Sequence, residues 1–326
     1  MTTKQPFQAA PYIKEIGRGA KGARSMDRGQ ARELWGAILD GRVSDLELGG
    51  ILLSMRIKGE SVEELEGFLE ASQASFEPLR APDCEYCPVV IPSYNGARKM
   101  ANLTALLALL LAREGVPVLV HGVAHDVGRV ATAEVFEALG MHAAADHASA
   151  EAALAKDRVA FITIDALAPQ LAWMLSLRRI LGVRNSTHTL VKIMQPFAGP
   201  ALRLVSYTHP EYLESLGEFF TLNKGHAFLM RGTEGETVAN ANKAQKIDWF
   251  HDGERTVLVE KQTLVEKLPE LPEDKSAEST AAWIQAVLSG DIPVPDSIAQ
   301  QVAHCKDVAR KLMSTLGSGT KVDISS

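Results

Sequence analysis

The sequence predicts an α/β protein in which a small N-terminal helical bundle precedes a larger α/β domain with a mostly parallel central sheet. In the first 80 residues, helix-capping patterns recur without any strand-like run between them. From residue 87 onward, short apolar runs rich in β-branched residues alternate with helical segments, as expected of parallel strands. A chain of 326 residues with 46% hydrophobic content is also long enough to form two domains.

Three helices are expected in the N-terminal region. Each starts at a polar residue that is followed three positions later by Glu or Gln, which is the spacing of a capping box. The pairs are Asp27 and Gln30, Ser44 and Glu47, and Ser61 and Glu64. Within these helices, apolar residues at helical spacing predict the core of the bundle. The clearest set is Leu48, Ile51, Leu52 and Met55.

Five strands are expected in the second region, with helices between them. The strands are predicted at 89–91, 118–120, 159–164, 202–207 and 226–230. Helices are predicted at 102–113, before Leu139 and after His209, and the 169–195 stretch contains no strand pattern. The apolar run at 103–112 is half the length of a membrane span, so it predicts a buried helix. Ligands bind at the carboxyl ends of parallel strands, which makes the loops after the first two strands candidate sites.

Composition narrows the class of protein. The three cysteines, Cys84, Cys87 and Cys305, do not form a disulfide framework, and the N-terminus has no apolar leader, so we expect a cytoplasmic protein without a membrane partner. Cys84 and Cys87 have the spacing of half a zinc or redox site, but no second pair follows them. The sequence therefore does not favour a metal or redox centre at these cysteines.

Positive charge is concentrated in particular segments, although the net charge is −6. Residues 178–246 contain nine Lys and Arg against five acidic residues, and residues 11–58 contain nine against six. Residues 252–296 have the opposite balance, with four basic and ten acidic residues. An acidic chain with cations gathered in its predicted cleft segments is consistent with a groove that binds a polyanion.

Two motifs follow the first two predicted strands. One is Pro92-Ser93-Tyr94-Asn95-Gly96-Ala97-Arg98-Lys99, with Asn102 after it, and the other contains His121-Gly122. Together with the helix that ends at Gly140, their order and spacing resemble anthranilate phosphoribosyltransferases of glycosyl transferase family 3. The resemblance covers nearly the whole chain and implies a nucleoside phosphorylase/phosphoribosyltransferase-like fold. It implies a helical domain of residues 1–82, joined by about 169–198, and an α/β domain of residues 83–168 and 199–326.

The residues that hold the substrate's diphosphate and Mg²⁺ in that family are replaced in this chain. The family's G-T-G-G-D turn aligns with 92–96, where proline has no N–H to donate to a phosphate. The K-H-G-N-R loop aligns with 120–124 and the S-G-S-A-D segment with 130–134. The metal-binding Asp-Glu pair becomes Thr237-Val238, which has no carboxylate for Mg²⁺, and Glu234 and Glu236 are the alternative ligands. We therefore expect no anthranilate phosphoribosyltransferase activity, no metal and no cofactor.

The replacing residues resemble a YbiB-type branch of the same family. That resemblance is carried by 92–99, by 184–189 and by 231–237. It implies a homodimer, joined through the helical domain, that binds nucleic acid without sequence preference, with single strands preferred. The candidate nucleic-acid- and anion-binding residues are Tyr94, Asn95, Arg98, Lys99, Asn102, His121, Arg184, Asn185, His188, Lys192 and Arg231.

Other interpretations of these residues remain open. Arg98 and Lys99 also fit a solvated helix start, and His121 fits a framework histidine bonded to its surroundings. Tyr94 suits either stacking on a base or filling the vacated phosphate pocket. For the whole chain, the alternatives are a phosphoribosyltransferase or other glycosyltransferase (a pentosyltransferase) with an unidentified acceptor, and a dimer that binds a protein partner in the same cleft.

Overall fold

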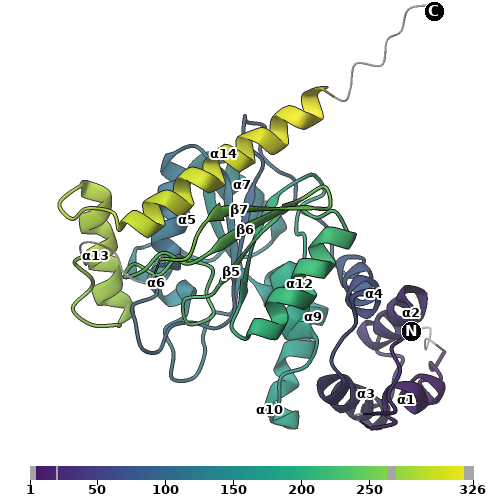
Figure 1. The fold of residues 1–326 in the computed structure, drawn as a ribbon. Helices are drawn as coiled ribbons and strands as arrows, with labels where there is room; N and C mark the ends of the chain where they lie inside the picture. Colours follow the sequence, from purple (N-terminus) through teal and green to yellow (C-terminus); the bar gives the residue numbers. More distant parts are fainter. Residues whose placement is uncertain (1–4, 20, 263–268, 319–326) are drawn as a thin grey trace, which may run out of the picture.

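The N-terminal region forms a helical bundle, shown at the lower right of Figure 1. The computed structural model describes residues 5–19, 21–262 and 269–318. The bundle contains α1 (Ala10–Ile16), α2 (Arg28–Leu39), α3 (Asp45–Lys58) and α4 (Val62–Gln73). The three expected capping boxes start α2, α3 and α4, which confirms the predicted helix starts. The four residues predicted as the core of α3 are all buried, so that prediction is also confirmed.

The α/β domain is built on a seven-stranded sheet with the order β3-β2-β1-β4-β5-β6-β7. The strands are β1 (Val89–Ser93), β2 (Val118–Gly122), β3 (Val159–Thr163), β4 (Leu202–Tyr207), β5 (Ala227–Arg231), β6 (Ile247–His251) and β7 (Glu254–Val259). The first five are parallel to one another and confirm the predicted strands, while β6 and β7 add antiparallel pairs. The mostly parallel sheet is therefore confirmed.

The sequence analysis missed the hairpin formed by β6 and β7. An Asp252-Gly253 turn joins the two strands, and both residues have positive φ, as a tight hairpin turn requires. Most of β7 is exposed. It therefore lacks the apolar run that identified the other strands. The many acidic residues after residue 252 also gave no strand pattern.

Helices cover both faces of the sheet. One face packs against α5 (Thr104–Arg113), α6 (Thr132–Ala138), α13 (Ala277–Ser289) and α14 (Asp296–Ser318). The other packs against α7 (His147–Asp157), α8 (Ile164–Leu167), α9 (Pro169–Ser176), α11 (Thr187–Ile193) and α12 (Pro210–Leu222), with the short α10 (Arg178–Leu181) beyond α9. Successive strand residues alternate between the two cores, so that Val89 and Ile91 face the first and Val90 the second.

The 169–195 stretch links the two domains. Helix α11 contacts α4 of the bundle and also lies against β4 of the sheet. The Ser186 hydroxyl donates a hydrogen bond to the Glu60 carboxylate just beyond α3. These contacts hold α11 between the bundle and the carboxyl ends of the strands. Across the described ranges, no helix is both long and apolar enough to cross a membrane, and the 103–112 run lies in the buried α5.

Helices α2 and α4 pack so closely at Gly67 that a larger residue there should destabilise the protein. A Cβ at Gly67 of α4 would lie 2.4 Å from the Arg28 carbonyl oxygen and 2.7 Å from the Ala31 Cβ. Gly67→Ala should therefore lower the free energy of unfolding by about 1–3 kcal/mol, the range for overpacked cores. Denaturant titration measures the change.

Gly36 of α2 is the matched control, because a Cβ there would meet no atom within 4 Å. Gly36→Ala should be neutral or stabilise the protein by up to ~1 kcal/mol, since alanine favours helix. Equal destabilisation by the two substitutions would contradict the proposed packing of α2 on α4.

Candidate functional site

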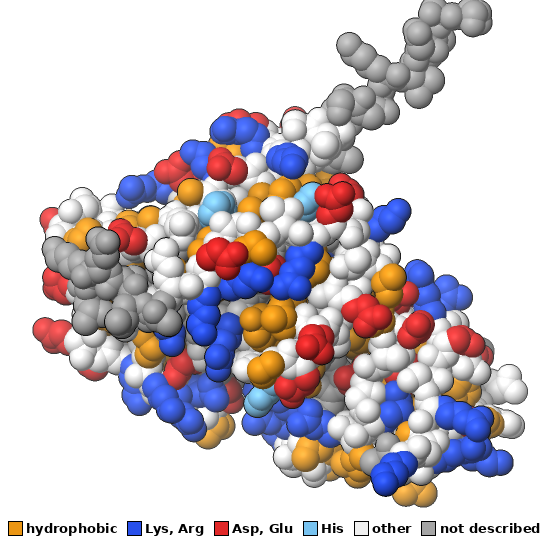
Figure 2. All heavy atoms as spheres, in the orientation of Figure 1, with side chains coloured by type: hydrophobic (Ala, Val, Ile, Leu, Met, Phe, Trp, Pro, Cys, Tyr) orange, Lys and Arg blue, Asp and Glu red, His pale blue; other side chains and the backbone are white. Residues whose placement is uncertain are grey.

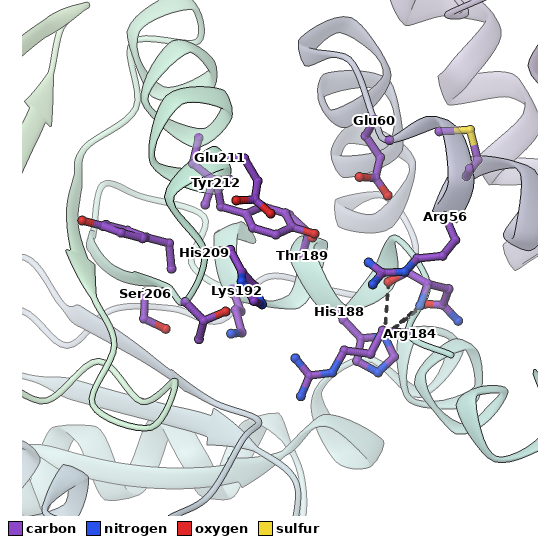
Figure 3. Close-up of a pocket in the computed structure, with 16 residues that line it drawn as sticks. Arg56, Glu60, Arg184, His188, Thr189, Lys192, Ser206, His209, Glu211 and Tyr212 are labelled. Carbon is purple, nitrogen blue, oxygen red and sulfur yellow. Dashed lines mark hydrogen bonds between the residues drawn. The ribbon is translucent and has the colours of Figure 1, made fainter. Parts of the chain in front are cut away.

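A cleft of about 380 Å³ lies between the helical domain and the carboxyl ends of the strands. Figure 3 shows Arg56 and Glu60 on the side of the helical domain and Ser206 and Tyr212 on the side of the α/β domain. Arg184, His188, Thr189 and Lys192 enter the cleft from α11 and the loop before it. The site therefore occupies the position that parallel-sheet topology predicts.

A second cavity of about 290 Å³ continues this cleft at the loop ends of the sheet. Thr208 lines both cavities. Four cations line the second cavity, and they come from the loops after β1 and β2 and from the end of β5: Arg98, Lys99, Arg129 and Arg231. Figure 2 shows Lys and Arg side chains gathered along the lower margin of the α/β domain, toward the helical domain. The two cavities together form the basic channel, as we call it below.

The loop after β1 is held by two carboxylates from the loop after β5. Oε1 of the buried Glu236 accepts hydrogen bonds from the backbone N–H of Asn95 at 2.9 Å and of Gly96 at 2.8 Å. The Glu234 carboxylate accepts from the N–H groups of Arg98 and Lys99. A run of loop amides that would otherwise attract an anion is therefore already bonded to the protein's own carboxylates.

Seven of the eleven predicted site residues are at least partly open to solvent. Arg98, Lys99 and Arg231 are exposed, and Tyr94, Arg184, His188 and Lys192 are partly buried. The basic channel is lined by six of these seven residues and also by the buried Asn185, so it contains seven of the eleven: Arg98, Lys99, Arg184, Asn185, His188, Lys192 and Arg231. Arg184 also donates a hydrogen bond from Nη2 to the Asn95 side-chain oxygen at 3.0 Å, which connects the α11 segment to the β1 loop.

The other four predicted residues are buried, and three of them are asparagines bonded to the framework. The Asn95 amide donates to the Gly235 carbonyl, and the Asn185 amide donates to the Met174 carbonyl. The Asn102 amide donates to the Val130 carbonyl and to the Thr132 hydroxyl, in the segment that the sequence analysis predicted to align with the family's S-G-S-A-D. These contacts position the loops of the channel, while a direct contact of these side chains with a ligand stays a prediction.

His121, the fourth buried residue, forms a hydrogen-bonded pair with Tyr94. The Tyr94 hydroxyl lies 2.7 Å from Nδ1 of His121. Burial lowers the pKa of His121 to about 3, so its imidazole is neutral at pH 7, and burial raises the pKa of Tyr94 well above its ordinary value. This geometry favours the interpretation in which Tyr94 fills the vacated pocket over the one in which it stacks on a base.

The α11 segment carries cations in an environment that disfavours charge. Burial and the nearby Arg178 and Arg129 lower the pKa of Arg184. Burial, with a smaller effect of Arg184, lowers the pKa of His188 to about 4, so this imidazole is neutral at pH 7. Burial also lowers the pKa of Lys192 to about 8, although Glu236 opposes the shift. A bound anion would relieve this repulsion among cations.

Sequence reasoning missed several residues of the channel. Arg56 and Arg129 line it, as do His209 and Tyr212, because the fold brings α3, the loop after β2 and the start of α12 to the same place. The position of Arg129 after a predicted strand was a usable signal. Of the cations counted in 178–246, Arg203 is buried and donates to the Ile193 carbonyl, and Lys246 pairs with Asp248 at 3.2 Å. Those two do not face the channel.

Within the described residues, no group of three or more His, Cys, Asp or Glu has the arrangement of a metal site. Thr237 and Val238, aligned with the family's metal-binding pair, are both buried. Cys87 is a free, buried thiol whose pKa burial raises to about 12, and Cys84 is partly buried and free. At such a pKa Cys87 stays protonated at pH 7, which does not suit a redox or metal role.

Comparisons with known proteins cover the same two regions. The helical bundle domain of the glycosyl transferase family matches residues 10–76, and the a/b domain of that family matches residues 95–321. A relative from Escherichia coli K12, named uncharacterized protein YbiB, is 46% identical over 94% of this chain and 96% of its own length. An anthranilate phosphoribosyltransferase of Methanopyrus kandleri is 26% identical over 89% of this chain and 86% of its own length.

Solved structures show the same fold. Anthranilate phosphoribosyltransferase (TrpD) of Thermus thermophilus superposes with a TM-score of 0.72 at 22% identity, covering 93% of this chain and 89% of that one. The enzyme of Saccharomyces cerevisiae in complex with PRPP and Mg superposes with a TM-score of 0.70 at 13% identity, covering 94% of this chain and 88% of that one. The expected fold and family resemblance are therefore confirmed.

The two carboxylates of the β5 loop should contribute unequally to stability. Glu236→Ala leaves the buried amides of Asn95 and Gly96 without an acceptor, so it should lower the free energy of unfolding by about 1–3 kcal/mol. Glu234→Ala frees amides that water reaches and should cost less. Denaturant titration compares them, with Glu236→Gln as the control that keeps an acceptor oxygen. An unchanged stability of Glu236→Ala would refute this role.

Proposed function

The chain belongs to the glycosyl transferase family whose helical bundle and a/b domains it contains, and we propose that its cleft binds single-stranded nucleic acid without reading the base sequence. The observation that carries this proposal is that side chains, and not free backbone amides, supply the positive charge at the site. The loop amides are bonded to internal carboxylates, whereas cations line the basic channel. Such an arrangement suits a chain of separate phosphates better than one compact diphosphate.

The balance of charge along the channel supports a polyanionic ligand. Its cations are Arg56, Arg98, Lys99, Arg129, Arg184, Lys192 and Arg231. The acidic residues that line it are Glu60, Glu211 and Glu234. Glu60 accepts a hydrogen bond from Ser186, and Glu234 is bonded to backbone amides, so two of these three carboxylates already have partners. Contacts to phosphates fix the position of a strand without specifying its sequence.

Aromatic side chains in the cleft support binding of a single strand over a duplex. Tyr207 and Tyr212 line the cleft and are partly exposed, and His209 lies between them in the chain. Bases of a single strand stack on such rings, and stacking tolerates any sequence. Tyr94 is bonded to His121, so it is a less suitable platform than Tyr212.

The same geometry argues against transfer of a phosphoribosyl group to anthranilate. The amides of the loop after β1 are occupied by Glu234 and Glu236, whose carboxylates add negative charge where the family's turn would meet a diphosphate. Like charges repel, and Thr237 and Val238 supply no carboxylate for Mg²⁺. The transition state of such a transfer needs its departing negative charge stabilised.

The proposal includes a homodimer formed through the helical domain. The outer face of α3 exposes Leu46 by 88%, Leu53 by 42% and Ile57 by 69%, and their spacing places them on one side of the helix. Ile180 of α10 is also 80% exposed. An apolar face of this kind on a polar bundle marks an interface, and a second copy would also extend the nucleic-acid surface.

Cleft cations should govern binding in a mobility-shift titration with single-stranded DNA at several salt concentrations. Replacing both Arg184 and Lys192 with alanine should weaken binding to all sequences alike and reduce the log–log salt slope by roughly 0.7 for every phosphate that is no longer bound. Lys156→Ala is the control, because Lys156 is exposed on α7 just before β3, at the opposite end of the sheet. If the cleft variant binds normally, or if Lys156→Ala weakens binding as much, the groove lies elsewhere.

Anthranilate and phosphoribosyl diphosphate with Mg²⁺ should yield no product above background, because the diphosphate-binding amides are occupied and the metal-binding pair is replaced. A fluorescence assay of anthranilate consumption provides the measurement. Turnover near the ~1–1,000 s⁻¹ of ordinary enzymes would instead support the glycosyltransferase alternative.

Light scattering at micromolar concentration should return the mass of a dimer. The double variant Leu53→Glu/Ile57→Glu should return a monomer, because it places charges in the apolar face. Leu222→Glu is the matched control, since Leu222 is 58% exposed on α12, outside the bundle. A monomeric wild type, or a dimer that survives the double substitution, would remove the interface from the proposal.

A further inference from the structure

Lys192 is a cleft lysine whose amine has no hydrogen-bond partner. It projects from α11 into the cleft, where Figure 3 places it among Ser206, His209 and the other cleft residues. Its side chain is partly buried, and its amine makes no hydrogen bond and no ion pair with any residue the structure describes. The amine is not one of the buried nitrogen atoms that lack a partner, so it is open to the cleft. An accessible amine without a partner in the protein is available to a ligand.

The surroundings of Lys192 favour a neutral, nucleophilic amine. Burial and Arg184 lower its pKa to about 8, although the charge of Glu236 acts to raise it. At that pKa roughly one amine in ten is neutral at pH 7, a fraction a few hundred times that of an ordinary lysine. The other titratable and charged groups that line the cleft are Arg56, Glu60, Tyr207, His188, His209, Glu211 and Tyr212. Desolvation of this kind is how proteins activate lysines that form imines.

Glu236 is a buried titratable group that interacts electrostatically with Lys192. Burial raises the pKa of Glu236, although the Ser93 hydroxyl and the Asn95 and Gly96 amides favour its charged form. Its Oε1 accepts hydrogen bonds from those two amides. A carboxyl group with a raised pKa that interacts with an amine is suited to exchange a proton with it.

We propose that Lys192 forms an imine with an aldehyde carried next to a phosphate, and that this aldehyde is the ring-opened sugar of an abasic site in single-stranded DNA. The abasic part of the inference rests on the proposed function. The cations around Lys192 would hold the flanking phosphates, and a site without a base would let the sugar enter the cleft to the depth of the amine.

The chemistry balances without an oxidant or a reductant. Glu236 takes a proton from the lysine ammonium, which leaves a neutral amine. The lone pair of Nζ then attacks the aldehyde carbon, a C–N bond forms, and the carbonyl oxygen takes one of the two remaining amine protons to become a hydroxyl. The hydroxyl receives the proton held by Glu236 and leaves as water, while the nitrogen retains one hydrogen in the protonated imine. One water is released for each imine formed.

A trapping experiment on the full chain tests the inference. A single-stranded oligonucleotide with one abasic site is incubated with the protein and sodium cyanoborohydride, which reduces an imine to a stable amine. We expect a covalent adduct of one protein with one strand, and peptide mass spectrometry should locate it on Lys192. The rate should rise with pH and level off near pH 8, whereas an ordinary lysine would continue to gain reactivity toward its pKa of 10.5.

Matched variants separate the amine from the charge. Lys192→Arg keeps a cation but loses the nucleophile. It should therefore retain affinity for intact strands, while the amount of adduct should fall by a factor of roughly ten or more. Lys156→Arg, at the opposite end of the sheet, should leave the adduct unchanged. Normal binding of intact strands also shows that Lys192→Arg is folded. Adducts on the N-terminal amine or on other lysines, or adducts undiminished in Lys192→Arg, would overturn the inference.

A second arm uses pyridoxal 5′-phosphate, an aldehyde beside a phosphate that contains no nucleic acid. Labelling of Lys192 by this probe, without an adduct to the abasic strand, would support the reactive amine and overturn the abasic-site form of the inference. Binding of intact strands without labelling of Lys192 by either aldehyde would overturn the whole inference and leave the proposed function standing. Labelling by the probe without any strand binding would refute the proposed function and the abasic-site form of the inference, and would support the reactive amine.

Discussion

The hydrogen bonds from the loop after β1 to Glu236 and Glu234 are the constraint on which the rest of the site depends. They join two loops that are about 140 residues apart in the chain, and they occupy amides that would otherwise attract anions. Because the backbone is satisfied internally, Arg98 and Lys99 are left exposed at the edge of the channel. The fold of a phosphoribosyltransferase is thus combined with a site whose positive charge resides in side chains.

Side-chain cations and backbone amides favour different anions. A turn of amides fits one compact group closely, whereas cations spread over several loops suit charges repeated along a chain. Here the spread cations come from α3, from the α11 segment, from the loops after β1 and β2 and from the end of β5. The hydrogen bond between Ser186 and Glu60 ties α11 to the helical domain. A ligand along the channel would therefore contact both domains at once.

Local patterns in the sequence were enough to predict the elements of the fold. The capping boxes and the five parallel strands depend on neighbouring residues, and they are confirmed. The β6–β7 hairpin was missed because exposed strands have no apolar run, although Asp252-Gly253 was a usable turn signal. The site was harder to predict. Motif position selected Asn102 and His121, which face inward, and overlooked Arg56 and Arg129, because only the three-dimensional fold shows which loops meet.

Photo-crosslinking of a single-stranded oligonucleotide that carries 4-thiothymidine, followed by peptide mass spectrometry, tests the central claim most directly. The account predicts crosslinks to peptides of the basic channel, chiefly those that contain Arg184 to Lys192 and Tyr207 to Tyr212. Stacked bases would place the photoreactive group against these side chains. Crosslinks confined to α7, α13 or α14, with none in the channel, would contradict the claim that this cleft is the nucleic-acid site.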